Sequence, residues 1–121
     1  MDNSKKIRMA QYGTKHGHAA GVLSVMLANP DVEVVGLFEP DAARRLELKE
    51  SGISPWSDVK WIDDKSEILQ DDSIVAISSE GSNLESLDHS EEIVDSGKHV
   101  FYDKPAGDNY DRFKTLIETA R

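Results

Sequence analysis

The chain has 121 residues, of which 38% are hydrophobic and 31% charged, a balance typical of one globular domain with a single core. Its formal net charge of −9 and its scattered basic residues disfavour nucleic acid as a partner. It contains no cysteine, which excludes disulfides, thiolate metal sites and cysteine nucleophiles. No apolar run reaches the roughly 18 residues of a membrane span, and the N-terminal residues lack a secretory signal, so we expect a cytoplasmic protein without a membrane partner.

Apolar patterning near the start of the chain predicts a strand, a helix and a second strand. Residues 5–12 alternate apolar and polar side chains and stop at Gly13, as a strand before a turn would. Apolar residues at positions 19, 22, 23, 26 and 27 form one face of a helix, which Asn29-Pro30 ends. Residues 32–38 are β-branched and apolar on both faces, which is typical of a strand covered on two sides.

Shorter signals mark the next elements. Asp41 can cap a helix that runs toward Gly52, where glycine suits the left-handed residue after a helix. Val59 and Trp61 indicate a short third strand, and residues 68–69 lie in a weakly helical stretch. The alternation of strand and helix therefore continues through the middle of the chain.

The last part of the chain predicts two more strands and two more helices. Residues 74–77 form a buried strand, and a helix from about 84 to 96 follows and ends at Gly97. Residues 99–102 form a fifth strand, and apolar spacing from position 108 onward predicts a final amphipathic helix. The whole pattern predicts an α/β fold over residues 1–121, a doubly wound parallel sheet with helices on both faces.

The residues that follow the predicted strands mark the candidate site, because open parallel sheets bind ligands beyond the carboxyl ends of their strands. Gly13 opens a loop between a strand and a helix, an arrangement that binds pyrophosphate through backbone N–H groups and the helix dipole. The G-x-G-x-x-G pattern is incomplete, since Lys15 and His18 stand at its second and third glycine positions. An ordinary tight turn between a strand and a helix is the alternative reading of this loop.

Glu39 ends the second predicted strand and is the candidate acceptor for an adenosine ribose. It lies 26 residues after Gly13, against a usual spacing of about 20. A carboxylate here would repel a 2′-phosphate and favour NAD over NADP, while Arg44 and Arg45 could soften that preference. The alternative is a solvated acid or part of a helix cap.

The segments GTKHGHA, VEVVGLFEPD and GKHVFYDKPAGD, in this order, resemble the N-terminal Rossmann domain of the glucose-fructose oxidoreductase and inositol dehydrogenase family (Gfo/Idh/MocA). The family's aGKHVxxEKP segment is matched by residues 97–100 and by Asp103-Lys104-Pro105, with Asp in place of Glu. The resemblance implies that Lys104 is catalytic, lying near the nicotinamide and hydrogen-bonding the reacting hydroxyl or carbonyl of the substrate. Asp103 and Pro105 would shape the part of the pocket around Lys104.

The resemblance also assigns the cofactor contacts. Ser78 and Ser79 stand where the family contacts the ribose and nicotinamide, although Glu80-Gly81 replaces the family's Pro-Asn pair. Residues 13–16 match a variant of the phosphate loop. The implied cofactor-binding residues are Gly13, Thr14, Lys15, His16, Glu39, Ser78, Ser79, Asp103 and Lys104.

The function implied by the resemblance is hydride transfer between NAD, with NADP possible, and a sugar, polyol or similar hydroxyl substrate. The resemblance covers nearly all of this chain but about the first third of a typical member. The family's remaining part supplies the substrate pocket, acid/base residues and the sheet used for oligomerisation. We therefore expect these 121 residues alone not to be catalytically competent, and a full-length form to be a homo-oligomer.

Two other readings are open. One is a nucleotide-binding or regulatory α/β module without turnover. The other is a phosphoryl-accepting receiver domain, which needs an acidic pair after the first strand, whereas Gln11 and Tyr12 stand there and Asp63-Asp64 follows the third strand. His16 and His18 have no third ligand in sequence reach, so no metal site is expected.

Overall fold

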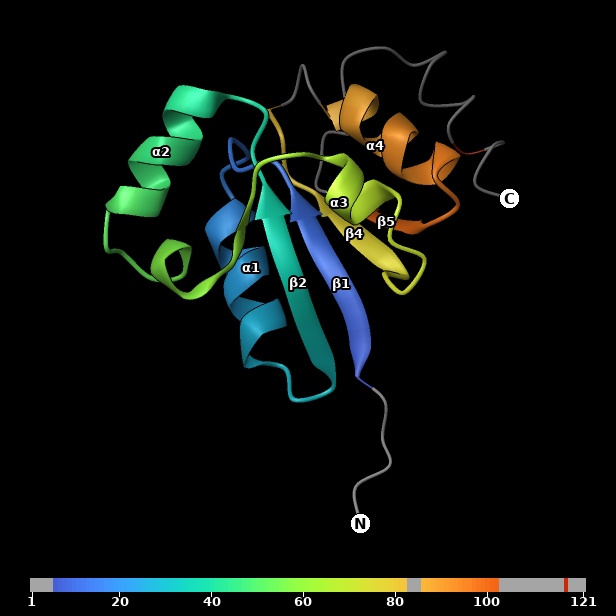
Figure 1. Ribbon diagram of the computed structural model, residues 1–121, viewed down its shortest axis with the longest axis horizontal. Helices are drawn as coiled ribbons and strands as arrows, with labels where there is room; N and C mark the ends of the chain where they lie inside the picture. Colours follow the sequence, from blue (N-terminus) through green and yellow to red (C-terminus); the bar gives the residue numbers. More distant parts are fainter. Residues whose placement is uncertain (1–5, 83–85, 103–116, 118–121) are drawn as a thin grey trace.

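The computed structural model describes residues 6–82, 86–102 and 117, which build a five-stranded parallel sheet with helices on both faces (Figure 1). The strand order is β3-β2-β1-β4-β5, so the chain starts in the middle, moves to one edge and then crosses to the other side of β1. The order therefore reverses between β1 and β4. The elements are β1 (Ile7–Tyr12), α1 (Ala19–Ala28), β2 (Val32–Phe38), α2 (Ala42–Glu50), the 3-10 turn η1 (Trp56–Asp58), β3 (Trp61–Ile62), α3 (Ser66–Leu69), β4 (Ala76–Ser79), α4 (Ser86–Asp95) and β5 (His99–Tyr102).

Two apolar clusters lie on opposite faces of the sheet, because successive strand residues point to opposite sides. On one face, Leu23 and Met26 of α1 pack on Leu37 of β2. On the other face, Ile93 of α4 belongs to a cluster with Ile77 of β4. Helices thus cover both faces, as the doubly apolar strands predicted, and the predicted fold class is confirmed.

The register of the central strands brings their carboxyl ends to one level. Tyr12, the last residue of β1, pairs with Phe38 at the end of β2 and with Ser79 at the end of β4. The loops after these three strands therefore emerge side by side at the switch point. This is the edge at which the polar residues of the sequence were expected to meet.

Three strands differ from their predicted bounds. The first begins at Ile7, later than the predicted position 5. The fourth strand begins at Ala76, later than predicted, and continues through Ser79. Ile74 lies outside it, because its N–H donates to the carbonyl of Asp71 (3.1 Å) and closes the preceding turn. The third strand shrinks to two residues, with Val59 outside it. The predicted helix from position 108 onward lies outside the described residues.

Lys98, between α4 and β5, has a structural role that the sequence did not indicate. Its side chain is 8% exposed, and its Nζ donates to the carbonyls of Asp71 (2.6 Å) and Ile74 (2.9 Å). The ammonium thus fixes the turn that leads into β4.

We expect Lys98→Met to lower the free energy of unfolding by about 2 kcal/mol, the scale of hydrogen bonds from a charged donor. Methionine keeps the apolar stem and leaves the carbonyls of Asp71 and Ile74 without their donor. Urea denaturation monitored by circular dichroism measures the loss. Lys60→Met, at an exposed position, is the control and should leave the midpoint unchanged; equal midpoints for both variants would contradict the assigned role of Lys98.

Candidate functional site

The loop after β1 is held between the ends of β2 and β4. The N–H of Gly13 donates to the carbonyl of Phe38 (2.7 Å), and the N–H of His16 donates to that of Glu80 (2.9 Å). The N–H of Glu80 in turn donates to the carbonyl of Tyr12 (2.8 Å). Backbone bonds to both neighbouring strands therefore fix the loop over the switch point.

Gly13 occupies a position that requires glycine. Its φ is +96°, in the region that L side chains rarely adopt, and a Cβ built there would lie 2.7 Å from the backbone nitrogen of Gly81. The tight turn expected at Gly13 is present.

Gln11, the penultimate residue of β1, ties this loop to the first helix. Its side chain is fully buried, and Nε2 donates to the carbonyls of Gly13 (3.1 Å) and Ala19 (3.4 Å). This contact could not be predicted from the sequence, because a polar residue near a strand end is equally typical of a solvated edge. A receiver domain would need an acid near this position, so the buried amide also argues against that reading.

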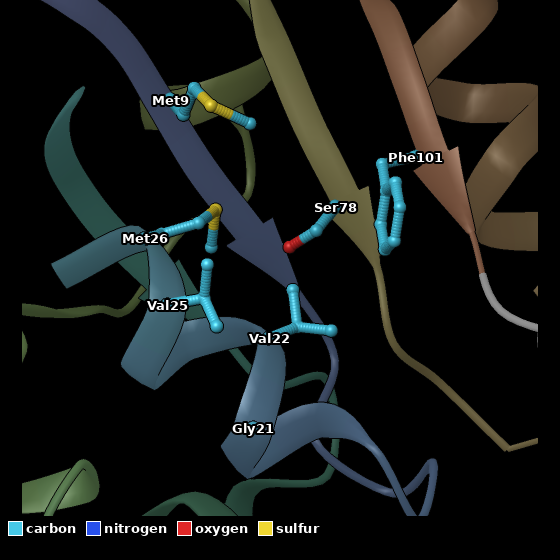
Figure 2. A pocket seen from close by; sticks show the side chains of 7 residues that line it. All are labelled: Met9, Gly21, Val22, Val25, Met26, Ser78 and Phe101. Carbon is cyan, nitrogen blue, oxygen red and sulfur yellow. The ribbon is translucent and has the colours of Figure 1, made fainter. Parts of the chain in front are cut away.

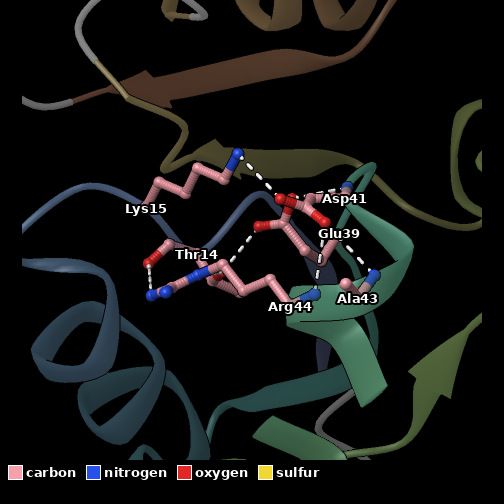
Figure 3. Close-up of polar contacts among 6 residues, drawn as sticks. All are labelled: Thr14, Lys15, Glu39, Asp41, Ala43 and Arg44. Carbon is pink, nitrogen blue, oxygen red and sulfur yellow. Dashed lines mark hydrogen bonds and ion pairs between the residues drawn. The ribbon is translucent and has the colours of Figure 1, made fainter. Parts of the chain in front are cut away.

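A chain of hydrogen bonds joins the loop to the end of β2 (Figure 3). The hydroxyl of Thr14 donates to Oε1 of Glu39 (2.5 Å) and accepts from Nε of Arg44 (2.6 Å). Nη2 of Arg44 also donates to the carbonyl of Thr14 (3.1 Å), and the N–H of Asp41 donates to Oε2 of Glu39 (2.9 Å). Glu39 is therefore an integrated part of the site, 1% exposed, and not the solvated acid of the alternative reading.

A second link connects the same loop to α2. Nζ of Lys15 lies 3.1 Å from Oδ2 of Asp41. Oδ1 of Asp41 accepts from the N–H groups of Ala43 (3.1 Å) and Arg44 (3.2 Å), which confirms the predicted helix cap. The Arg44 N–H, followed by the ammonium of Lys15, holds the pKa of Asp41 below its ordinary value.

The two arginines of α2 point to different places. Arg44 reaches Thr14, whereas Nη1 of Arg45 donates to the carbonyls of Ile62 (3.5 Å) and Asp63 (3.3 Å). The guanidinium of Arg45 also lies 5.7 Å from the ring centre of Phe38. The sequence could not separate the two residues, and the structure places Arg44 alone of the pair at the site.

The two serines at the end of β4 face opposite sides of the sheet. Ser79 accepts a hydrogen bond from the hydroxyl of Ser90 in α4 (3.1 Å). Ser78 is fully buried on the face covered by α1, and its hydroxyl has no hydrogen-bond partner among the described residues. Ser78 and Ser79 therefore do not converge side by side. Asp103 and Lys104 lie outside the described residues.

An apolar hollow of about 340 Å³ lies between α1 and the sheet, on the face of Ser78 (Figure 2). Phe101 of β5 and Val25 of α1 border it and are 51% and 68% exposed. Because its lining carries no ionisable side chain, the hollow has no group for acid/base work and no charge to pair with a phosphate. Its lining residues are Met9, Gly21, Val22, Val25, Met26, Ser78 and Phe101.

Residues 6–82, 86–102 and 117 contain neither a cluster of metal ligands nor a membrane-spanning helix. No three histidine, aspartate or glutamate side chains in these ranges come close enough together to hold a metal ion. No helix in the same ranges has the length and apolar character needed to cross a membrane. The charged residues at the carboxyl ends of β1 and β2 therefore remain the candidate site.

Comparison with known proteins identifies the family. Residues 8–121 match the family described as "Oxidoreductase family, NAD-binding Rossmann fold". No curated protein matches the chain at a significant level. The match covers the glycine loop, Glu39 and the Lys104 segment alike.

Solved structures share the fold at low sequence identity. An NAD-binding protein from Listeria innocua matches with a TM-score of 0.76 and 21% identity, covering 96% of this chain and 31% of its own. A 3-ketoreductase from Actinomadura kijaniata, in complex with TDP-benzene and NADP, matches with a TM-score of 0.76 and 19% identity, over 97% of this chain and 35% of its own. The biliverdin reductase of Synechocystis sp. PCC 6803, in complex with biliverdin and NADP+, matches with a TM-score of 0.76 and 19% identity, over 95% of this chain and 34% of its own.

This chain thus spans about a third of the length of these proteins. Their likeness shows the shared fold, and the family match extends over nearly the whole sequence. The parallel sheet with its strand order reversed between β1 and β4 is the arrangement expected of a dinucleotide-binding domain. The chain belongs to the Gfo/Idh/MocA oxidoreductase family and contains its NAD-binding Rossmann domain.

Proposed function

We propose that this domain holds a nicotinamide dinucleotide across the carboxyl ends of β1, β2 and β4, for hydride transfer to or from a sugar, polyol or similar hydroxyl compound. The observation that carries the proposal is the placement of Glu39 against the glycine loop, through the hydroxyl of Thr14 (2.5 Å). An acid beside a phosphate-binding loop is what recognition of an adenosine ribose and its pyrophosphate requires. An ordinary turn between a strand and a helix would need neither a buried acid nor a hydrogen bond from the loop to that acid.

The pyrophosphate would lie over the loop of residues 13–16 and the start of α1. Gly13 lets the backbone turn tightly there. The N–H of Ala19, the first residue of α1, donates to the carbonyl of His16 (3.0 Å), so the next N–H groups, those of Ala20 and Gly21, are the helix-end donors proposed to meet the anion. The helix dipole adds partial positive charge at the same point. We assign Gly13, Thr14, Lys15 and His16 to this part of the site. The N–H groups of Gly13 and His16 donate to the carbonyls of Phe38 and Glu80, so these two residues would shape the loop while the start of α1 supplies backbone donors.

The adenosine ribose would lie beside Glu39, whose carboxylate can accept hydrogen bonds from both hydroxyls of the diol. The same negative charge disfavours a 2′-phosphate, so the proposed preference is for NAD, with NADP also accepted. The ketoreductase and biliverdin reductase that share the fold were both solved with NADP or NADP+. Use of either dinucleotide is thus compatible with this architecture.

The nicotinamide half would extend toward the ends of β4 and β5. The dinucleotide supplies or accepts the hydride when bound. We assign the strand end formed by Ser78 and Ser79, whose side chains face opposite sides of the sheet, to its ribose and nicotinamide side, and Asp103 to the neighbouring part of the pocket. Lys104, which follows β5 in the sequence, would hydrogen-bond the reacting oxygen of the substrate. It would stabilise the alkoxide that develops as hydride adds to a carbonyl carbon or, in the reverse direction, as the hydroxyl loses its proton.

The substrate pocket would be completed by a substrate domain outside these 121 residues. That domain would supply the acid/base partners of Lys104 and the oligomer contacts of a full-length form. The chain alone would then bind the dinucleotide without turning over substrate. The solved neighbours bind TDP-benzene and biliverdin, two unlike molecules, so we propose the substrate class from the family resemblance and not from the shared fold.

Glu39→Gln should weaken NADH binding about tenfold and NADPH binding less, because it removes the charged ribose acceptor together with the repulsion of a 2′-phosphate. Glutamine keeps the size of this buried side chain. Quenching of tryptophan fluorescence or calorimetry would give both dissociation constants. Glu47→Gln, at an exposed position of α2, is the control. Equal losses for the two dinucleotides would argue against a ribose contact by Glu39.

A further inference from the structure

Ser78 carries a buried hydroxyl on the face of the sheet that α1 covers. The side chain is fully buried, and its Oγ has no hydrogen-bond partner among the described residues. Figure 2 shows this Oγ directed into the apolar hollow between α1 and the sheet. Because a buried polar group without a partner costs free energy, the hydroxyl marks a point at which a bound hydrogen-bond donor would be stabilised.

The hollow has the size and the composition of a small-molecule site. Its volume of about 340 Å³ lies within the range of roughly 300–1,000 Å³ that is typical of ligand pockets. A cavity of about 150 Å³ holds benzene, so the hollow has room for a molecule of two fused rings. It also combines an apolar lining with one hydroxyl, that of Ser78, as ligand pockets do.

Gly21 leaves the helix side of the hollow open. It lies within α1, where glycine is less favourable than alanine, yet a Cβ built there would meet nothing within 4 Å. No close contact therefore requires glycine at this position. Its effect is to leave space between α1 and the sheet, beside Val22 and Val25.

The side chains around the hollow favour a neutral aromatic ligand. Phe101 presents a ring that is 51% exposed, and Met9 and Met26 supply thioethers, which make favourable contacts with aromatic rings. No ionisable side chain lines the hollow, so a charged ligand would lose its hydration without gaining an opposite charge. The formal net charge of −9 on the chain further disfavours an anion.

We propose that the hollow between α1 and strands β1, β4 and β5 binds a neutral aromatic molecule of one or two rings, whose N–H or O–H group donates to Oγ of Ser78. Val25 and Phe101 border the hollow and are exposed, so a ligand can enter from solvent. The loop of residues 13–16 and Glu39 lie outside its lining. The inference therefore does not rest on the proposed dinucleotide function.

The test is titration of the purified 121-residue chain with indole and with benzofuran, which has the same bicyclic shape but no N–H group. Calorimetry gives the two dissociation constants, and amide chemical shifts show where each probe binds. We expect saturable binding of both probes, with shifts at the amides of Gly21, Val22, Val25 and Phe101. Circular dichroism establishes that each sample is folded.

Gly21→Leu should weaken both probes at least about tenfold, because the added side chain takes up part of the space that the ring would fill. Leucine is a better helix former than glycine, so α1 itself should not be destabilised. Ser24→Leu is the matched control, since Ser24 is an exposed residue of the same helix and lies outside the lining. Equal affinities in the wild type and Gly21→Leu would overturn the assignment of the hollow.

Ser78→Ala tests the contact with the hydroxyl. Alanine removes a buried group that has no partner among the described residues, so the variant should be at least as stable as the wild type. Indole should bind about three- to tenfold more weakly, the effect of one neutral hydrogen bond, while benzofuran should bind as before. Equal changes for the two probes would overturn the hydrogen bond to Ser78.

Sedimentation velocity of the same samples examines whether a second chain fills the hollow instead. We expect a monomer in both the wild type and Gly21→Leu. A wild-type chain that associates, and that becomes monomeric in Gly21→Leu, would make the hollow a contact between copies and overturn the ligand site. A folded wild-type chain that binds neither probe would also overturn it, and would leave the proposed dinucleotide function standing.

Discussion

Gly13→Ala is expected to abolish measurable dinucleotide binding and to lower the free energy of unfolding by about 2–4 kcal/mol. The φ of +96° disfavours any side chain, and the new Cβ would lie 2.7 Å from the nitrogen of Gly81 and 3.0 Å from the carbonyl carbon of Glu80. These are backbone atoms of the residues that follow β4, and they cannot shift as easily as the end of a flexible side chain. Relief therefore requires the loop to move away from β4, which breaks the bond between the His16 N–H and the Glu80 carbonyl.

Gly17→Ala is the control for this change. Gly17 lies in the same loop, but a Cβ there would meet nothing within 4 Å. Its stability and its affinity for NADH should stay close to those of the wild type. Urea denaturation and NADH titration of both variants measure the two quantities. A Gly13→Ala protein with wild-type affinity would show that the observed loop geometry is not needed for binding.

Lys104→Ala should reduce turnover about 10²- to 10³-fold, the usual effect of removing a group that stabilises a developing oxyanion. The measurement needs a protein that joins this domain to a substrate domain, because the substrate pocket is proposed to lie there. Affinity for NADH should change little, since the lysine is assigned to the reacting oxygen of the substrate. Steady-state kinetics and a separate NADH titration distinguish the two effects.

Lys60→Ala, at an exposed position, serves as the control for loss of a positive charge. Lys104 lies outside the described residues, and its assignment rests on the Asp-Lys-Pro segment after β5. Turnover that is unchanged in Lys104→Ala would remove this residue from the mechanism. A parallel loss of NADH affinity and turnover would instead assign it to cofactor binding.

Local signals in the sequence were sufficient for most of the fold. The apolar spacing of α1, the cap at Asp41 and the buried pattern of β2 depend on residues close to one another in the chain. Positive φ angles occur at Gly13, Gly52 and Gly97, each of which was expected at a turn or a helix end. These features could be predicted because their physical causes are conformational preference and periodic burial.

The contacts that shape the site depend on residues far apart in the sequence. Lys98 reaches a carbonyl 27 residues earlier, and Arg44 bonds Thr14 across 30 residues. Arg45 stands next to Arg44 and has no distinguishing sequence signal, yet it points elsewhere. The sequence could therefore place Glu39 and the glycine loop at one edge of the sheet, but not the hydrogen bonds that connect them.

Calorimetric titration of the purified 121-residue chain with NADH, and then with NADPH at the same ionic strength, tests the central claim most directly. The site described here predicts saturable binding of one NADH per chain, with weaker binding of NADPH because of the charge of Glu39. Circular dichroism on the same sample establishes that the protein is folded. A folded chain that shows no saturable heat with either dinucleotide would contradict the assignment of this edge of the sheet as a cofactor site.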